Sequence, residues 1–375
     1  MENRNQYVWL DFIRGLSALA VFIGHLRIIC FHDGKETAGL DIYSKIIFFL
    51  TGFGHLAVVI FFALSGFLII KSIHEAVLKN KWNALHYAQD RLFRLWVVLI
   101  PALVLGLVLD RIGIAYWGDS LFYSNRWKYF LNQDIENKLT AVIFFGNVFF
   151  VQKILVPTLG SNGALWSLAN EFWYYVVFPL FYFTAINWYK LIYRVVFFIA
   201  AILLLVFVGK QIALSFPIWL MGGLSYIITK TVDEKHLKRK ELLFLFSLLF
   251  VVFLVLCRLK FHEEIFNSYS VSFVFAIAIP FLCKAQMKSN ILKSVSSFFS
   301  DISYTLYLAH LPFIYLVTSI LGFQDRTWSY KYFMLYLGLV VLTLLYSALL
   351  WFLFEKNTKK IKWRIIGRGR GHFIS

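Results

Sequence analysis

About ten mostly apolar runs follow one another along this 375-residue chain, and they restrict the folds open to it. A transmembrane helix needs about 20 predominantly apolar residues, because backbone polar groups in lipid must be satisfied within the segment itself. Hydrophobic residues make up 60% of the chain and charged residues only 15%, whereas soluble domains carry about a quarter charged residues. The sequence therefore predicts an all-α integral membrane protein, with about ten transmembrane helices in one bundle around a polar channel.

The predicted spans divide the chain into one membrane domain and a short tail. The spans cover residues 7–28, 46–71, 93–110, 164–186, 191–208, 211–230, 242–259, 268–283, 300–321 and 332–354. The apolar segment 139–152 is short and fits an interfacial or re-entrant segment better than an eleventh span, which stays open. We expect residues 1–355 to form the membrane domain, with the long loop 111–163 on its outer face and a basic tail at 356–375.

Lysine and arginine residues gather in loop 72–92, in loop 231–241 and in the tail after Glu355. With ten spans all three segments lie on one side, which the positive-inside rule makes cytoplasmic. An extra span at 139–152 would place loop 72–92 opposite the other two. We therefore expect a multi-pass protein with both termini in the cytoplasm and a tail that binds anionic membrane lipids. The net charge of +17 fits these loops better than a nucleic-acid-binding surface.

The cysteines give no sign of a metal site, because Cys30, Cys257 and Cys283 lack metal-ligand spacing. No metal is expected. The predicted topology puts Cys30 and Cys257 near the outer face, where a disulfide between them is conceivable. Buried free thiols are the preferred interpretation.

Arg14 and His25 lie inside the first apolar run, eleven residues apart. Ionisable groups at membrane depth are costly, so they usually face a protein interior or a water-filled cavity. Eleven residues end about 20° beyond three full turns, which places both side chains on one helix face roughly 16 Å apart. The ordinary structural explanations are a pair between Arg14 and Asp11, one turn away, and a hydrogen-bonded helix-end role for His25.

Sorting the polar residues by predicted depth gives two clusters. The inner cluster comprises Arg14, Ser65, Arg91 and Arg94. Such a cationic group suits a phosphate-bearing ligand that arrives from the cytoplasm. The outer cluster, His25 with Glu171, joins an imidazole to a carboxylate, as a general base requires. The alternatives are ordinary flanking charges at the two α-helical arginines of the third span and a small-residue packing contact at Ser65 and Gly66.

The ninth span carries a further polar face. Ser303, Tyr307 and His310 share this face, and Pro312 can kink the helix after them. For His310 the preferred explanation is a structural histidine before the kink. Glu171 resists a purely structural explanation, because an acid within an aromatic-rich span needs a partner.

A set of motifs that contains these residues resembles the membrane acyltransferase 3 family across nearly the whole chain. The motifs are the Arg14 and His25 pair within LDFIRGLSALAVFIGH, FFALSGFLI at 61–69, RLFR at 91–94, WSLANEFWYYVVFP at 166–179, which begins with Trp166, and ISYTLYLAHLPF at 302–313. Each motif is weak evidence by itself. Their occurrence in this order, across about ten spans, is strong evidence.

The resemblance implies transfer of an acyl group, usually acetyl from cytoplasmic acetyl-CoA, to a hydroxyl of an extracytoplasmic or lipid-linked glycan. It also implies a bacterial inner membrane protein with acyl-CoA as co-substrate. The CoA phosphates would meet Arg91 and Arg94, and the thioester arm would pass Ser65. Succinyl or longer acyl chains stay open, as do acceptors from O-antigen, capsule and peptidoglycan to small glycosides.

The resemblance also implies roles at the reacting end. His25 would remove the proton from the acceptor hydroxyl, with Glu171 orienting the imidazole. Arg14 would bind the pantetheine arm or stabilise negative charge on the thioester oxygen. A route in which His25 is acylated first is equally compatible with these residues.

Two other classes of protein compete with the enzyme. Intramembrane arginine, histidine and glutamate also build proton-coupled transporters and flippases, and such folds often show inverted repeats. We find no internal repeat in this chain. A sensor or scaffold with a degenerate site is the third class, which the complete set of expected site residues disfavours. The oligomeric state is not determined by the sequence.

Overall fold

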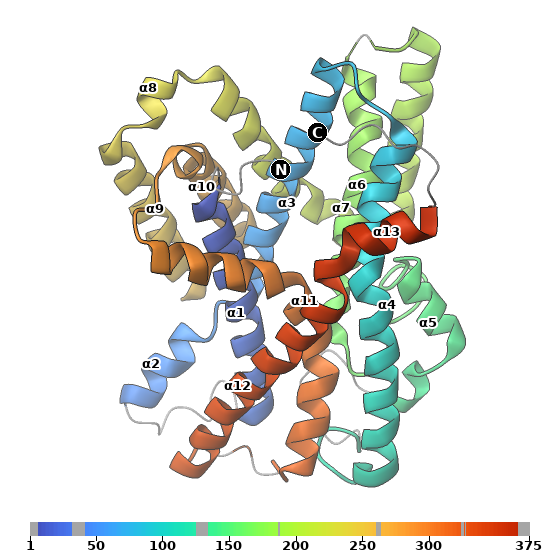
Figure 1. Cartoon of the computed structure of the whole chain (residues 1–375), viewed down its shortest axis with the longest axis vertical. Helices are drawn as coiled ribbons and strands as arrows, with labels where there is room; N and C mark the ends of the chain where they lie inside the picture. The colour runs from blue at the N-terminus through green and yellow to red at the C-terminus, as the bar shows by residue number, and fades with distance from the viewer. Residues whose placement is uncertain are drawn as a thin grey trace.

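The computed structural model describes residues 7–31, 42–124, 134–186, 188–259, 264–323, 326 and 328–366. Within these ranges the fold consists of helices and connecting segments, with no β-strand beyond an isolated bridge between Gln152 and Val156 (Figure 1). The α-helices are α1 (Val8–Cys30), α2 (Ile42–Leu50), α3 (Gly54–Leu78), α4 (Ala84–Trp117), α5 (Ala141–Val148), α6 (Trp166–Ala185), α7 (Leu191–Thr231), α8 (Glu234–Leu237), α9 (Lys240–Arg258), α10 (Glu264–Lys284), α11 (Asn290–Ile320), α12 (Tyr330–Leu353) and α13 (Thr358–Ile366). Short 3₁₀ helices cover η2 (Glu136–Lys138), η3 (Gly163–Leu165) and η4 (Glu355–Asn357).

Among the described residues, 7 helical stretches are long and apolar enough to cross a membrane. They are Val8–Cys30, Ile42–Leu78, Ala84–Trp117, Leu191–Thr231, Lys240–Arg258, Ile265–Lys284 and Tyr330–Ile366. The predicted all-α membrane fold is thus confirmed, whereas the count of ten is not. Helices α6 and α11 also cover predicted spans. Their polar site residues lower their mean hydropathy, so they are not among these 7 stretches.

The long helix α7 accounts for two of the predicted spans. Gly209 has φ 83° and ψ 169° within it, a backbone conformation that residues with a Cβ rarely adopt. The helix is therefore interrupted where the predicted ranges 191–208 and 211–230 meet. Cys30, Cys257 and Cys283 are free thiols, as expected; Cys30 and Cys283 are buried, whereas Cys257 is only half-buried.

Helices α1 and α11 pack in parallel and form the centre of the bundle. The Ser296 hydroxyl donates to the Val8 carbonyl at 3.1 Å, close to the start of both helices. A Cβ at Gly15 would overlap Phe299, so the two helices approach closely at this point. Their contacts continue to His25, near the end of α1.

Pro312 removes a backbone donor from α11, because proline has no N–H to bond the carbonyl four residues earlier. That carbonyl belongs to Leu308, and the Asn162 Nδ2 amide donates to it at 2.7 Å. Asn162 belongs to the connection before α6, so this bond fixes the connection on α11. The backbone hydrogen bond that Pro312 removes is thus replaced by a side-chain hydrogen bond from another part of the chain.

The segment between α4 and α6 folds onto the bundle through buried polar side chains. The Asn147 amide bonds the carbonyls of Ile143 and Pro157 at 2.8 and 3.0 Å, and the Trp96 indole donates to the Val148 carbonyl at 2.9 Å. Helix α5 has 8 residues and so extends about 12 Å, too short to cross a bilayer. Residues 125–133 of the predicted outer loop lie outside the described residues.

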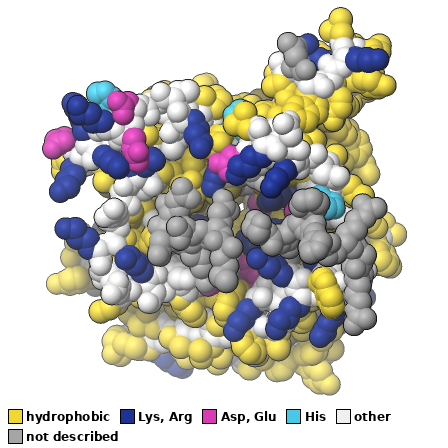
Figure 2. All heavy atoms as spheres, turned by 45° about the horizontal axis from the view of Figure 1, so that its top comes forward, with side chains coloured by type: hydrophobic (Ala, Val, Ile, Leu, Met, Phe, Trp, Pro, Cys, Tyr) yellow, Lys and Arg dark blue, Asp and Glu magenta, His cyan; other side chains and the backbone are white. Residues whose placement is uncertain are grey.

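The basic segments meet at one end of the bundle, which we call the basic end. Ion pairs join Lys230 of α7 to Glu75 of α3 at 3.9 Å and Lys362 of α13 to Asp90 of α4. Figure 2, which brings the top of Figure 1 forward, shows lysine and arginine side chains spread over this face. The predicted gathering of basic loops is therefore seen, within the described residues.

Helix α8 is held at the basic end by α10. Lys284 of α10 contacts Glu234 at 3.1 Å, and Lys238 contacts the same carboxylate at 3.3 Å. Hydrogen bonds from Lys284 and Lys238 lower the pKa of the Glu234 carboxyl, which is exposed to solvent. The contacts tie loop 231–241 to the end of α10.

Candidate active site

A cavity of about 640 Å³ lies among α1, α3, α4, α6 and α11, with α13 at its edge. Its lining includes predicted site residues from all five main helices: Arg14, Ser65, Arg91, Arg94, Glu171, Ser303 and Tyr307. The other predicted residues lie outside the lining: Asp11, His25, Trp166 and His310. The structure thus joins the predicted inner cluster to Glu171, which the sequence placed in the outer one.

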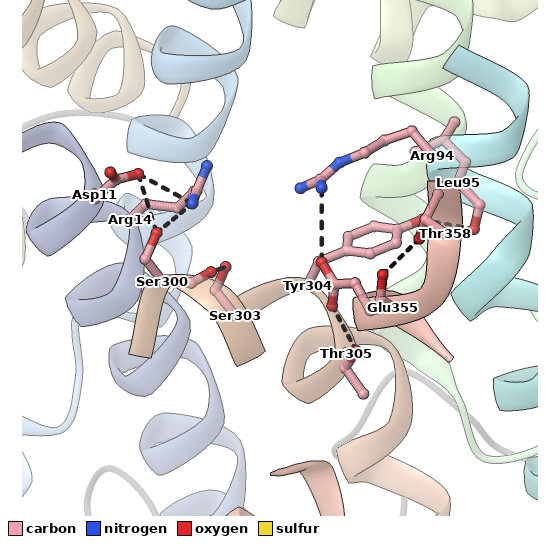
Figure 3. A network of polar contacts seen from close by, with 10 residues as sticks. All are labelled: Asp11, Arg14, Arg94, Leu95, Ser300, Ser303, Tyr304, Thr305, Glu355 and Thr358. Carbon is pink, nitrogen blue, oxygen red and sulfur yellow. Dashed lines mark hydrogen bonds and ion pairs between the residues drawn. The ribbon is translucent and has the colours of Figure 1, made fainter. Parts of the chain in front are cut away.

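Four cationic side chains line this cavity. They are Arg14 of α1, Arg91 and Arg94 of α4, and Lys359 of α13. Figure 3 shows the guanidinium groups of Arg14 and Arg94 directed toward one another from α1 and α4. Because like charges repel across such a gap, an anionic ligand between them would be favoured.

Arg91 lines the cavity without an anionic partner among the described residues. It lies one turn before Arg94 on α4, and its guanidinium carbon lies 5.5 Å from the centre of the Tyr87 ring. Across the part of the chain that the structure describes, Arg91 has no hydrogen bond or ion pair, and its Nε is buried without a partner. A guanidinium in this state requires an anion or water for its donors.

Arg14 has partners on its own helix and on α11. It forms an ion pair with Asp11 at 3.0 Å and donates to the Ser300 hydroxyl, which in turn donates to Asp11 at 3.1 Å (Figure 3). The ordinary pair with Asp11 is therefore present. Even so, Arg14 lines the cavity, and its Nε is buried without a hydrogen-bond partner. Ser303, one turn after Ser300, also lines the cavity.

Arg94 connects the cavity to the residues that follow α12. Its guanidinium pairs with Glu355 at 3.7 Å and lies 5.7 Å from the centre of the Tyr304 ring. The Thr305 hydroxyl donates to the same Glu355 carboxylate at 2.6 Å. The Arg94 side chain nevertheless keeps 49% of its surface accessible, because it extends into the cavity.

Glu171 has hydroxyl partners in place of the predicted histidine. Tyr175, one turn later on α6, donates to the Glu171 carboxylate, and Ser65 donates to it at 3.3 Å. The Trp219 indole of α7 donates to Ser65 at 3.2 Å. The predicted pair between His25 and Glu171 is therefore not what the structure shows. The rotation of α6 about its own axis explains the difference, because the face that carries Glu171 is turned toward α3 and α7.

The predicted small-residue packing contact at Ser65 and Gly66 is also present. A Cβ at the neighbouring Gly66 would overlap the carbonyl oxygen of Trp219, so α3 and α7 touch at this point. The absence of a Cβ allows the close contact that brings the Trp219 indole to Ser65. Packing and a polar lining are thus served by the same dipeptide.

His25 bonds a second histidine. Its Nδ1 lies 2.8 Å from Nε2 of His310, and His310 Nδ1 lies 2.8 Å from the Leu306 carbonyl oxygen. The two rings are 13° from coplanar, with centroids 5.1 Å apart. A nitrogen separation of 2.8 Å is too short for face-to-face stacking, so the rings meet edge to edge through a hydrogen bond.

Tyr307 links the cavity to this histidine pair. It lines the cavity and its ring centroid lies 6.3 Å from that of His310. Its hydroxyl donates to the Ala164 carbonyl at 3.0 Å, so the Ser167 hydroxyl 2.6 Å away is the donor in their shared bond. Trp166 does not line the cavity and packs edge-on against Phe62. The Tyr307 hydroxyl is therefore held against the η3 connection.

A family model described as an acyltransferase domain matches residues 7–352 of the chain. This chain belongs to the acyltransferase 3 family. The resemblance drawn from its motifs is thereby confirmed, and the chain is a membrane acyltransferase by family. No curated protein and no solved structure gave a significant match to it.

Sequence reasoning missed several cavity residues of this acyltransferase. Tyr175, Tyr304 and Lys359 line the cavity, and Glu355 pairs with Arg94. The one usable signal was Glu355, a lone acid between an apolar run and a basic tail. Tyr175 and Tyr304 are indistinguishable by pattern from the many other aromatic residues of their spans. Within its described ranges, this acyltransferase shows no cluster of His, Cys, Asp and Glu that could hold a metal ion.

Proposed function

We propose that the protein transfers an acyl group, acetyl in the simplest case, from acyl-CoA to a hydroxyl of a glycan or lipid-linked sugar. The observation that carries this proposal is the cavity at the basic end, whose cations include the unpaired Arg91. CoA bears several phosphate charges, and arginine binds phosphate through paired N–H donors. We assign the CoA phosphates to Arg91, Arg94 and Lys359.

The cavity also supplies a path for the thioester arm. From the cations it continues past Ser65 and Glu171 to Tyr307. Tyr307 contacts His310, which bonds His25. Because His25 lies about 16 Å farther along α1 than Arg14, an extended arm reaches from the basic end toward the histidine pair. The acceptor hydroxyl then approaches from the opposite end of the bundle.

In the proposed reaction His25 acts as general base. It takes the proton of the acceptor hydroxyl, whose oxygen forms a bond to the thioester carbonyl carbon. The carbon–sulfur bond breaks, and His25 returns the proton to the CoA thiolate. Proton transfer of this kind contributes about 10²- to 10⁴-fold in rate. Arg14 stabilises the charge that develops on the carbonyl oxygen or holds the arm, and Glu171 offsets the positive charge of the lining.

The proposal is tested with protein purified into lipid nanodiscs. Acetyl-CoA binding and the slow release of free CoA to water are measured, so that no acceptor need be known. We expect His25→Ala to lose release by at least about 100-fold while binding is kept, and Arg91→Ala/Arg94→Ala to lose binding. Lys238→Ala is the matched control, because this exposed cation lies at the same end outside the cavity.

Three results would contradict the proposal. Equal losses in the control and in the double arginine variant would show that the cavity cations are not special. Failure of wild type to bind or consume any acyl-CoA, together with sugar flux across vesicles, would establish the transporter class instead. Absence of both activities would favour a sensor or scaffold.

A further inference from the structure

The bonds of the histidine pair determine where its protons lie. A carbonyl oxygen only accepts, so His310 Nδ1 carries the proton that bonds Leu306. In neutral His310 the other nitrogen, Nε2, is then an acceptor. His25 Nδ1 must therefore be the donor in the 2.8 Å bond between the rings. The lone pair of neutral His25 consequently lies on Nε2.

The surroundings of His310 keep this arrangement in place. Its side chain is fully buried, with a relative exposure of 0%. Its ring packs edge-on against Phe22 and lies beside Tyr307. Its described hydrogen bonds go to His25 and Leu306, and none joins it to a carboxylate. A buried neutral ring with both nitrogens occupied has one stable tautomer and one orientation.

We propose that His310 is the positioning residue of His25, holding it with the proton on Nδ1 and the basic lone pair on Nε2. This inference rests on the proposed function, in which His25 is the base. When His25 Nε2 takes the proton of the acceptor hydroxyl, the Nδ1–H bond to His310 becomes charge-assisted and stronger. No proton moves to His310, and the proton on His25 Nε2 leaves with the CoA thiolate.

A neutral partner suits this place in the bundle. A carboxylate beside His25 would perform the same orienting role, but its own burial would carry a large desolvation cost in a membrane interior. The Leu306 carbonyl polarises His310, and His310 polarises His25, without any resting charge. The structure thus assigns to a carbonyl and an imidazole the role that sequence reasoning gave to Glu171.

The test separates positioning from packing with two substitutions at one site. His310→Phe keeps a ring of similar shape but removes the acceptor, whereas His310→Gln places an amide oxygen where Nε2 lay. Both leave the Leu306 carbonyl with its helical backbone partner. We expect His310→Phe to lower kcat for CoA release at least 100-fold, with KM for acetyl-CoA and Tm nearly unchanged. His310→Gln should regain at least tenfold of that loss.

The control for coupling is the double variant His25→Ala/His310→Phe. If His310 acts through His25, the double variant loses no more activity than His25→Ala alone. Near-normal kcat in His310→Phe overturns the inference, as does a glutamine variant that is no better than phenylalanine at equal Tm. Full activity in His25→Ala would instead overturn the proposed base, so the two failures are distinguishable.

A direct measurement does not depend on the His310 variants. Nitrogen-15 NMR of histidine-labelled wild type in lipid reports the protonation of each ring nitrogen, with the His25 signals identified by their loss in His25→Ala. We expect His25 to be protonated at Nδ1 and unprotonated at Nε2. Protonation at Nε2 would overturn the inference without any assay of activity.

Discussion

Two arginines one turn apart on α4 meet different surroundings. Arg94 is paired with Glu355, whose side chain is only 9% exposed. Arg91 has no ion pair or hydrogen bond to any residue that the structure describes. Removal of a partner from a buried acid leaves an uncompensated charge, whereas removal of an unpaired cation leaves none. The two residues should therefore separate binding from stability.

We predict that Arg91→Ala weakens acetyl-CoA binding about tenfold, which corresponds to about one lost charged contact, with Tm unchanged or raised. Arg94→Ala should weaken binding similarly and lower Tm by several degrees, because Glu355 loses its cation. Isothermal titration and thermal unfolding in detergent check both results. A fall in Tm for Arg91→Ala, or none for Arg94→Ala, would contradict the assignment.

Residue patterns predicted the faces of helices but not their neighbours. Periodicity correctly placed Arg14 and His25 on one face of α1, and both bond α11, through Ser300 and His310. It could not predict which helix that face meets. Two residues at the same depth can lie on opposite sides of the bundle, because depth does not determine the order of the helices around it. The choice of Glu171 as the partner of His25 failed for that reason.

Among the elements, α11 and the connection before α6 depend on each other. Pro312 leaves the Leu308 carbonyl without a helical donor, and Asn162 replaces that donor at 2.7 Å. The spacing of polar residues in ISYTLYLAHLPF predicted a shared polar face, and Pro312 predicted a kink after it. The motif contained no information about Asn162, which lies 146 residues away. Long-range compensation of this kind is visible only in three dimensions.

We predict that Asn162→Ala lowers the free energy of unfolding by about 1–3 kcal/mol, the cost of leaving a buried carbonyl unsatisfied. Pro312→Ala restores the backbone N–H at that position. The double variant Asn162→Ala/Pro312→Ala should therefore recover most of the loss. Reversible unfolding in mixed micelles measures all three variants. Simple additivity of the two single effects would show that the carbonyl is not the link between them.

At the scale of the whole molecule, apolar runs predicted an all-helical membrane protein, and the family match supports it. The number of spans was less certain, since 7 helical stretches meet a strict apolar criterion. The discrepancy comes largely from α6 and α11, whose site residues dilute their hydropathy, and from α7, which joins two predicted spans. Hydropathy is therefore least informative about the helices that build the site.

We predict that the basic end faces the cytoplasm, as its lysine and arginine content requires. Lys235 of α8 and Asp119 after α4 are both exposed and lie outside the cavity. A cysteine at Asp119 should react with a membrane-impermeant maleimide in intact cells, whereas one at Lys235 should react only after permeabilisation. A background variant with Cys257→Ser serves as the control. The reverse pattern would invert the proposed path of acyl-CoA.

The parallel contact of α1 with α11 has a consequence for biosynthesis. The bond between His25 and His310 joins residues 285 positions apart, and Arg14 meets Ser300 across 286. A growing chain therefore exposes Arg14 and His25 to the insertion machinery long before their partners on α11 have left the ribosome. A ribosome-bound chain that stops short of α11 can hold helices α1 to α10 and still lack a working site.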